Sequence, residues 1–372
     1  MKIGIYTIHA CNNFGAMLQA YATVRFLNEH GHEAELVNVV TDKAQRDMRY
    51  IGPWSSPKGI VRNLYALLNP TVYKKIDNFR KFRQLMPLSK KYYSTEEVVA
   101  NPPHYDLHLV GSDQVWNVER GMGSSFFFLP FIHDTFKKAS FASSFGNIEP
   151  AHKYTEELKT LLARFSHISV READAATFIN QELQIKAAHV LDPTFLLNAE
   201  EWGEIAGNAP LVKGNYILYY GFDTSKTCGD VISHLKKQMN MPVIGISVSL
   251  HSPYKFDKFY QEAGPVEFLN LIKYARLVLT SSFHGMALSI NFRKDFVVLR
   301  HGTRMSRMES LLNDFSLKDC IIDDASAMAA KNGEYKVMYS NERILELTNN
   351  SKRFLLSIID KIKDKRESQR KI

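Results

Sequence analysis

Short apolar segments alternate along this chain with stretches in which apolar residues recur every three or four positions. Segments of the first kind are typical of buried strands, and the second spacing is typical of amphipathic helices. The alternation begins with a predicted strand at residues 2–8. A helix with Leu18, Tyr21 and Phe26 on one face follows, and then a second predicted strand at residues 36–40. Strands that alternate with helices form parallel sheets with right-handed crossovers, so the pattern predicts an α/β fold.

The same alternation continues through most of the chain. Further strands are predicted at residues 106–110, 139–142 and 168–170, from His189 into an Asp192–Pro193 break, and at residues 216–220, 243–248, 277–279 and 296–299. Helices are predicted up to about residue 165 and at residues 226–239 and 266–274, and the tail from Asn341 is predicted to be helical.

The chain length of 372 residues indicates more than one domain. Single hydrophobic cores stop growing at roughly 250–300 residues. A polar, turn-rich stretch at residues 198–213 is the best place for a boundary. We therefore predict one α/β domain at residues 1–197, a second at residues 198–340, and a helix with a charged tail at residues 341–372.

Composition narrows the class of protein. A hydrophobic content of 45% with 23% charged residues is ordinary for a globular protein. No segment approaches the ~18 apolar residues of a membrane span, and the N-terminus enters a strand rather than a signal peptide. The three cysteines, Cys11, Cys228 and Cys320, are scattered. They favour a reducing cytoplasm over a structural zinc site, so we expect a cytoplasmic protein without bound metal.

The positive charge is concentrated in residues 43–91. This segment has twelve Lys and Arg residues and two acidic residues, a net charge of +10 against +8 for the whole chain. Ile60, Leu64 and Leu68 indicate an amphipathic helix within it, and we interpret the segment as an insertion covering part of the first domain. Such a segment can be a solvated face, or it can bind a polyanion or an anionic membrane surface.

The strongest candidate for a site is residues 275–291. An apolar strand ends there in Thr280, Ser281 and Ser282, and a helix begins around His284. Ligands bind at the carboxyl ends of parallel strands, and helix N-termini attract anions. A cluster of helix-capping serines beside an incidental surface histidine would leave the same pattern.

Two other strand ends carry charged residues. Asp113 follows the strand at residues 106–110. It can accept a proton or a hydrogen bond from a substrate hydroxyl, or simply cap the next turn. Arg171 follows the strand at residues 168–170. Its guanidinium can hold a carboxylate or phosphate in a bidentate manner, or pair with a neighbouring Glu172 or Asp174.

The loop at residues 9–15 feeds the first helix. It is rich in asparagine and can cradle an anion at the helix N-terminus, although Asn13 can equally be an ordinary helix cap. The loop lacks the GxGxxG pattern, which gives a dinucleotide site little support.

Four of these stretches, taken together and in order, resemble the polysaccharide pyruvyl transferases. They are residues 12–20, 110–117, 169–172 and 280–285, and residues 192–195 and 264–269 fit as well. The resemblance implies two Rossmann-like domains with parallel sheets that face each other across a cleft, as in the glycosyltransferase B architecture. It also implies transfer of the enolpyruvyl carbons of phosphoenolpyruvate onto two hydroxyls of one sugar residue, which gives a cyclic pyruvate ketal and phosphate.

The resemblance further implies the partners. The acceptor is expected to be a surface polysaccharide or its lipid-linked precursor. No metal, organic cofactor or nucleic acid is expected. The basic segment at residues 43–91, rather than the resemblance, leaves open a peripheral contact of the protein with the inner face of the membrane.

By resemblance, His284 occupies the position of the family's histidine and Arg171 that of its phosphoenolpyruvate-binding arginine. We expect His284 to be a general acid or a phosphate ligand, because histidine titrates closest to neutral pH. Asp113 is the candidate base for an acceptor hydroxyl. Ser281 and Ser282 are expected at the donor, and Asn13, Gln19 and Asn117 are expected at the acceptor.

One residue departs from the family pattern. Several members have an arginine where this chain has Ser282, so the donor's charge must be met elsewhere, by Arg300, Arg304 or Arg307. Two other functions stay open. One is a sugar transferase of the same architecture that uses a nucleotide-sugar donor, and the other is a non-enzymatic polyanion-binding protein that uses residues 43–91.

Overall fold

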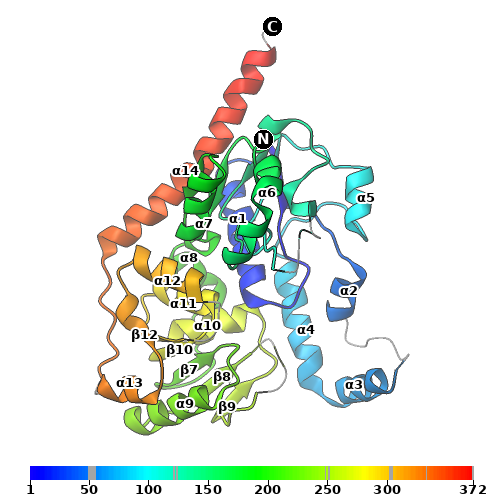
Figure 1. The fold of residues 1–372 in the computed structure, drawn as a ribbon. Coiled ribbons are helices and arrows are strands. Elements are labelled where there is room, and N and C mark those ends of the chain that lie inside the picture. Colours follow the sequence, from blue (N-terminus) through cyan, green and yellow to red (C-terminus); the bar gives the residue numbers. More distant parts are fainter. Residues whose placement is uncertain are drawn as a thin grey trace.

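Two parallel β-sheets organise the chain in this computed structural model (Figure 1), which describes residues 1–48, 56–119, 122, 125–247, 249, 252–300, 305–331 and 333–370. The first sheet has the order β2-β1-β3-β4. Its strands are β1 (Lys2–Tyr6), β2 (Glu33–Leu36), β3 (Leu107–Val110) and β4 (Lys138–Ser140). A parallel pair, β5 (Ile168–Val170) and β6 (Ala187–His189), continues it through isolated bridges from Ala139 to His167 and from Ser143 to Val170.

The second sheet comprises six parallel strands in the order β12-β11-β10-β7-β8-β9. They are β7 (Ile217–Tyr220), β8 (Val243–Ile246), β9 (Lys258–Tyr260), β10 (Leu277–Thr280), β11 (Phe296–Leu299) and β12 (Ile321–Ile322). The central strands β7, β10 and β11 are buried along their whole length, as expected when helices cover both faces of a sheet.

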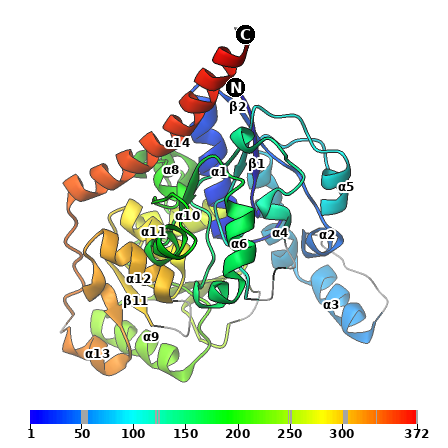
Figure 2. The same cartoon turned by 45° about the horizontal axis from the view of Figure 1, so that its top comes forward.

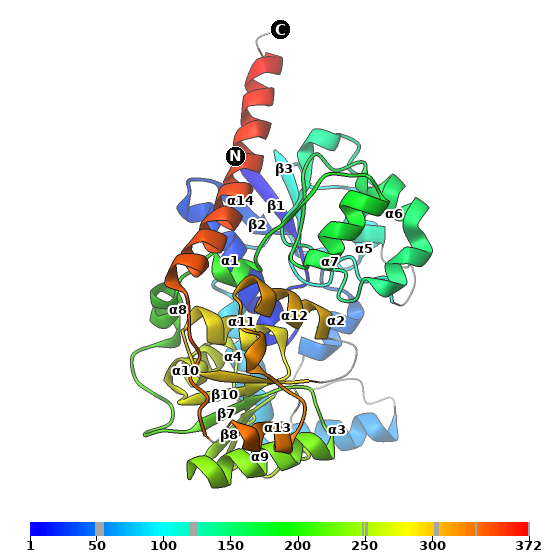
Figure 3. The same ribbon diagram turned by 60° about the vertical axis from the view of Figure 1, so that its left-hand side comes forward.

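Helices connect the strands and cover the sheets (Figures 1 and 3). In the first part of the chain they are α1 (Phe14–Glu29), α2 (Asp42–Met48), α3 (Pro57–Leu68), α4 (Pro70–Arg83), α5 (Thr95–Ala100), α6 (Thr155–Leu162) and α7 (Ala173–Thr177). In the second they are α8 (Ala199–Ala206), α9 (Lys226–Met239), α10 (Pro265–Tyr274), α11 (Phe283–Asn291), α12 (Met305–Asp314), α13 (Ala325–Ala330) and α14 (Asn341–Arg370).

The predicted α/β class with parallel sheets is confirmed, and most predicted strands lie within two residues of their predicted positions. Two boundaries differ. The strand predicted at residues 36–40 is β2, at Glu33–Leu36, because it pairs with β1 from Lys2 to Ile5 and the chain then leaves the sheet. The strand predicted from His189 onward instead ends there, because the Asp192 carboxylate accepts the Thr194 N–H and begins a short turn of 3₁₀-helix.

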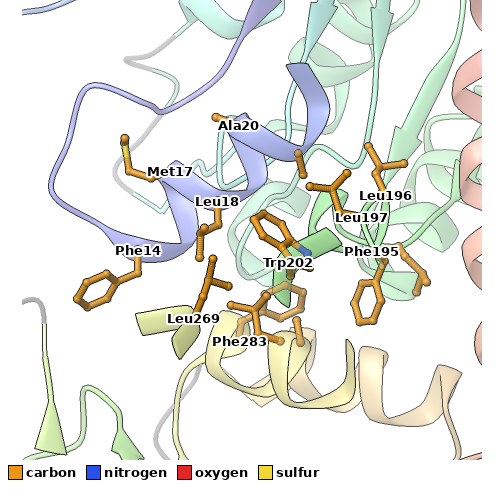
Figure 4. Close-up of a cluster of buried hydrophobic side chains, with 14 of the residues drawn as sticks. Phe14, Met17, Leu18, Ala20, Phe195, Leu196, Leu197, Trp202, Leu269 and Phe283 are labelled. Atoms are coloured by element: carbon orange, nitrogen blue, oxygen red, sulfur yellow. The ribbon is translucent and has the colours of Figure 1, made fainter. Parts of the chain in front are cut away.

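A single hydrophobic core joins the two sheets. It includes side chains from β1 and β3 as well as from β7, β10 and β11. Helix α1 lies at its centre (Figure 4), where Leu18 faces Leu269 of α10 and Trp202 of α8. The two halves of the chain are therefore packed against each other rather than connected by a linker alone.

Phe14, the first residue of α1, is the aromatic centre of this junction. Its ring stacks on Phe79 of α4 with centroids 5.2 Å apart, and on Phe268 of α10 with centroids 4.8 Å apart. Tyr220 of β7 meets it edge-on at 5.6 Å. Helix α4 belongs to the basic segment, so this segment packs on the second half of the chain as well as the first. Lys75 of α4 likewise donates to the Ser247 carbonyl at 2.6 Å.

The C-terminal helix α14 returns from the second half of the chain to the first (Figures 1 and 2). Its side chains Leu355, Ile358 and Ile359 are buried in the shared core. Ser351 accepts the Leu191 N–H at 2.9 Å. None of the helices in the described ranges has both the length and the apolar character needed to cross a membrane.

We predict that Phe14→Ala destabilises the whole protein by about 3–5 kcal/mol, because it removes a fully buried ring that three other rings contact. Urea unfolding followed by circular dichroism measures the change. Leu345→Ala, at a side chain that is 60% exposed, is the matched control and should change the free energy of unfolding by less than about 0.5 kcal/mol. Equal effects of the two substitutions would contradict this account of the junction.

Candidate functional site

A cavity of about 410 Å³ lies where the carboxyl ends of strands from the two sheets meet. Its lining includes Asn13 and Asp113 from loops after β1 and β3, and Ser281, Ser282 and His284 from the corner between β10 and α11. Arg307 of α12 also lines it. The cavity therefore draws on both halves of the chain, at the position where open α/β sheets bind their ligands.

His284 lies in the first turn of α11. The preceding Ser282 caps this helix, and its hydroxyl accepts the Gly285 N–H at 3.5 Å. Thr280 secures the corner by accepting the Ser282 N–H at 3.0 Å and donating to the Tyr220 carbonyl at 2.6 Å. The predicted strand, polar corner and helix are thus present. The imidazole is not on the outer surface but is only 8% exposed, against the cavity.

Gly15 brings the two halves of the site together. A Cβ atom at this position would overlap the imidazole of His284, so the first turn of α1 packs directly on the ring. Only glycine allows the backbone to approach the ring this closely. The N-termini of α1 and α11 consequently meet at the cavity.

Arg171, at the end of β5, is completely buried behind the cavity wall. Its guanidinium donates to three carboxylates. Nη1 lies 2.8 Å from Asp192 Oδ2, Nε 3.1 Å from Glu172 Oε1 and Nη2 3.4 Å from Asp113 Oδ1. The guanidinium also lies over the Phe283 ring, 4.5 Å from its centroid. Of the two interpretations of this residue, the ion pair with Glu172 is present, extended by two further carboxylates.

Asp192 links Arg171 to the histidine. Its Oδ1 accepts the Thr194 N–H at 3.0 Å and the Thr194 hydroxyl at 2.8 Å, and its Oδ2 lies 3.7 Å from His284 Nε2. The carboxylate is fully buried, and its bonds to Thr194 and Arg171 orient it toward the imidazole. Our sequence reasoning did not assign Asp192 to the site. It follows a strand end, as Asp113 and Arg171 do, and that signal could have identified it.

The electrostatics favour a neutral histidine beside an ionised aspartate. Burial lowers the pKa of His284 below its usual value, and the negative charge of Asp192 opposes this only in part. Burial acts to raise the pKa of Asp192, but the attraction of His284 when its imidazole is protonated and the positive charge of Arg171 outweigh it, and the net shift is downward. At neutral pH these shifts give a neutral imidazole next to a carboxylate that would stabilise its protonated form.

Glu172 completes the charged cluster. Its Oε1 accepts from Arg171 and from the Ser144 hydroxyl at 2.5 Å. Burial raises the pKa of Glu172 despite the neighbouring guanidinium. Glu172 therefore holds a proton more readily than an ordinary glutamate.

Asp113 lies on the cavity wall, with its side chain 16% exposed. Its backbone has a φ of 68°, in the left-handed region that aspartate tolerates better than most residues. The carboxylate is thus held between Arg171 on its inner side and the cavity on its outer side. This position suits contact with a ligand.

The three residues predicted to contact the acceptor have different environments. Asn13 lines the cavity and also caps α1, accepting the Ala16 N–H at 3.1 Å. Gln19 is fully buried and joins the loops after β1 and β3, because it donates to the Thr7 hydroxyl at 2.9 Å and accepts the Ser112 N–H at 3.2 Å. Asn117 does not line the cavity but donates to Gln114 Oε1 at 2.8 Å, and Gln114 does line it.

The three arginines considered in place of Ser282 are also separated. Arg300 is about half exposed, pairs with Glu309 and Asp323 at 2.6 Å each, and does not line the cavity. Arg304 lies outside the described residues. Arg307 lines the cavity, with its guanidinium carbon 6.0 Å from the centroid of Phe283.

Within the described ranges, no group of three or more His, Cys, Asp or Glu side chains is arranged to hold a metal ion. The carboxylates of Asp113, Glu172 and Asp192 instead surround the guanidinium of Arg171.

Solved structures with the same overall arrangement support the fold. The chain is similar to UDP-N-acetylglucosamine 2-epimerase from Rickettsia bellii, with 10% identity, a TM-score of 0.53, and 96% of each chain covered. It is also similar to the UDP-GlcNAc 2-epimerase from Neisseria meningitidis bound to UDP-GlcNAc, with 12% identity, a TM-score of 0.51, and 97% of this chain and 100% of that one covered. At such low identity the likeness shows the fold alone, and it confirms the glycosyltransferase B class.

No curated protein matches the chain in sequence. The family model for polysaccharide pyruvyl transferase, however, matches residues 13–303, from the loop after β1 to just beyond the end of β11. This range covers most of the chain and includes Asp113, Arg171, Asp192 and His284. The chain therefore belongs to the polysaccharide pyruvyl transferase family.

Proposed function

We propose that this protein transfers the enolpyruvyl carbons of phosphoenolpyruvate onto two hydroxyls of one sugar residue. The acceptor would be a surface polysaccharide or its lipid-linked precursor, and no metal or organic cofactor takes part. One observation supports this most directly. His284, at the N-terminus of α11, shares a cavity with the carboxylate of Asp113 and the positively charged guanidinium of Arg307, in a chain of this family.

The proposed reaction makes two C–O bonds at carbon 2 of the donor and breaks one. Carbon 3 gains a proton and becomes a methyl group, the first hydroxyl bonds to carbon 2, and the bond from carbon 2 to the phosphate oxygen breaks. The second hydroxyl then closes the ketal. One of the two hydroxyl protons balances the proton at carbon 3, and the other leaves with the phosphate or to solvent.

His284 is the proposed acid for carbon 3. Burial lowers the pKa of His284, but a bound anion would add to the negative charge of Asp192 and raise the pKa of the imidazole. Binding of the donor would thus favour protonation of the His284 imidazole. Asp113, on the opposite wall, is the proposed base for the first hydroxyl.

Arg307 is the proposed ligand for the anionic donor in place of the arginine that Ser282 replaces. It lines the cavity, and its charge already acts on His284, whose pKa it helps to lower. The N-terminus of α11, the positive end of its helix dipole, and the hydroxyls of Ser281 and Ser282 lie on the same side of the cavity.

Arg171 receives a different role from the donor clamp expected by resemblance. All three nitrogens of its guanidinium donate to carboxylates, and it does not line the cavity. We propose that it positions Asp113 and Asp192, which in turn face the donor and His284. Gln19 has a similar positioning role for the loops that hold Asp113.

A test of the donor compares thermal stability with phosphoenolpyruvate, a panel of nucleotide sugars and plain phosphate. A ligand at about 100 times its Kd that binds only the folded state adds about 2.7 kcal/mol. We expect phosphoenolpyruvate to stabilise more than phosphate does, and phosphate to be released from it when a suitable sugar is added. Stabilisation by a nucleotide sugar alone would contradict the proposal and support a sugar transferase on the same fold.

We predict that His284→Gln lowers turnover by about 10²–10⁴-fold, the usual cost of losing a general acid. It should also abolish a pH effect. In the native protein, phosphoenolpyruvate binding should weaken from pH 7 to pH 8.5, because the proton that His284 must take up becomes scarcer. The phosphate of the donor, with a second pKa of about 6, is already ionised over that range. Calorimetric titration at several pH values measures both the affinity and the proton uptake.

His104→Gln is the matched control, because His104 is exposed and outside the cavity. It should leave turnover and the pH dependence unchanged. Unaltered turnover in His284→Gln would remove the acid role, and an unaltered pH slope would remove the coupling to donor binding.

We predict that Arg307→Ala raises the KM for phosphoenolpyruvate by roughly 10–150-fold, the value of a charge-assisted hydrogen bond of about 1.5–3 kcal/mol. Arg300→Ala is the matched control, because it removes an arginine that pairs with Glu309 of α12 but does not line the cavity. Its KM for phosphoenolpyruvate should stay within about twofold of the native value. Steady-state kinetics with saturating acceptor measure both. A larger effect of Arg300→Ala than of Arg307→Ala would contradict the proposal that Arg307 contacts the donor.

A further inference from the structure

Helix α3 carries an apolar surface that faces away from the protein. Six of the fourteen exposed large hydrophobic side chains among the described residues lie on this one helix of 12 residues. They are Ile60, Val61, Leu64, Tyr65, Leu67 and Leu68, and we refer to them as the apolar face of α3. Scattered apolar side chains are normal on protein surfaces, whereas a concentration of this kind marks an interaction site.

The spacing of these residues places them on one side of the helix. Ile60, Leu64 and Leu68 are four residues apart, and so are Val61 and Tyr65. The opposite side contacts the protein through small or polar residues, since Asn63 and Ala66 are buried. In most amphipathic helices of globular proteins the apolar side faces the core, whereas in α3 it faces outward.

The helix is well defined at both ends. The Ser56 hydroxyl accepts the Gly59 N–H at 3.1 Å and caps the start of α3. Asn69 ends α3 and caps the next helix, α4, by accepting the Thr71 N–H at 3.1 Å. The chain therefore turns sharply at Asn69. All three views show α3 at the edge of the molecule, beyond the end of α4 (Figures 1, 2 and 3).

Charge indicates what this surface contacts. Residues 43–91, which include α3, have a net charge of +10. Lys74 is exposed within the first turns of α4, just past the corner at Asn69. An apolar helix face on a basic segment fits the interface of an anionic bilayer, where the apolar side chains enter the acyl boundary and basic side chains meet the lipid headgroups.

We propose that the apolar face of α3 docks on an anionic lipid bilayer and holds the protein at the membrane surface. A soluble polyanion would use the charge but leave the apolar side chains in water, so it fits this surface less well. The proposal does not depend on the reaction at the cavity, because bilayer binding is measured without donor or acceptor. A lipid-linked acceptor would, however, meet the protein at such a surface.

Flotation of the full chain with vesicles tests the proposal. The vesicles are phosphatidylcholine alone, or phosphatidylcholine with about one third phosphatidylglycerol. We expect the native protein to bind the anionic vesicles at least ~10-fold more tightly than the neutral ones, and to bind less as salt is raised, because salt screens the lysines. No binding to anionic vesicles would overturn the proposal.

A pair of double variants isolates the apolar face. Val61→Glu with Leu68→Glu changes the two most exposed residues of the apolar face of α3, at 67% and 83% exposure. Met338→Glu with Leu345→Glu makes the same chemical change at 77% and 60% exposure elsewhere. We expect the α3 variant to lose at least ~10-fold in vesicle affinity while the control stays within about threefold of the native protein. Equal losses would show that added negative charge alone is responsible and would overturn the role of the apolar face.

Two further measurements keep the result decisive. If the α3 variant is less stable to heat than the control, Leu64→Gln with Leu68→Gln, which adds no charge, replaces it and carries the same expectation. Light scattering after gel filtration reports self-association. A dimer that the α3 variant dissociates, together with no vesicle binding by the native protein, would assign the face to a second copy of the chain and overturn the proposal.

Discussion

The buried guanidinium of Arg171 is the interaction on which the site depends. A charge without water around it is costly, and this one is stable only because Asp113, Glu172 and Asp192 surround it. Each of these carboxylates also performs a second task. Asp192 faces His284, Asp113 faces the cavity, and Glu172 accepts from Ser144. Removing Arg171 would leave the buried carboxylates of Glu172 and Asp192, and the cavity-facing carboxylate of Asp113, without their common partner, a loss of several kcal/mol. Substitution of Arg171 would therefore lower the stability of the fold, and any change in ligand binding could not be separated from that loss.

A second constraint places the site at a packed junction. Phe14 is stacked between α4 and α10, and the next residue, Gly15, contacts the imidazole of His284. Two consecutive residues thus contribute to the core and to the site: Phe14 packs in the core, and Gly15 packs on the histidine of the cavity. Because one hydrophobic cluster includes side chains from both halves, packing sets their relative position and places His284 Nε2 3.7 Å from Asp192 Oδ2. Precise placement of an acid beside its partner carboxylate is the condition for proton transfer.

Much of this arrangement can be predicted from local sequence. Strand ends predicted the positions of Asp113, Arg171 and His284, because the carboxyl ends of parallel strands gather at one edge of a sheet. Local patterns could not show which way a side chain points. The partners of Arg171 lie up to 58 residues away, and Gln19 contacts Ser112 across 93 residues. Periodicity likewise predicted α3 as a helix but not that its apolar side would face outward, since that depends on what the rest of the fold leaves uncovered.

The balance of charge around the cavity relates these constraints to the family's chemistry. Arg171 and Arg307 contribute two positive charges, whereas Asp113, Glu172 and Asp192 can contribute three negative ones. With Ser282 in place of an arginine, an anionic donor would meet too little positive charge unless a proton came with it. Two groups can take that proton, namely His284, whose imidazole is neutral at neutral pH, and Glu172, whose pKa burial already raises. A serine in place of the arginine beside the histidine is therefore compatible with anion binding. Part of the positive charge that the anion needs would come from a group that gains a proton instead of from an arginine, which is always charged. Under the proposed reaction, the chain would take up a proton when it binds the donor, so binding would be tightest at lower pH, and a proton held by His284 would be available for carbon 3.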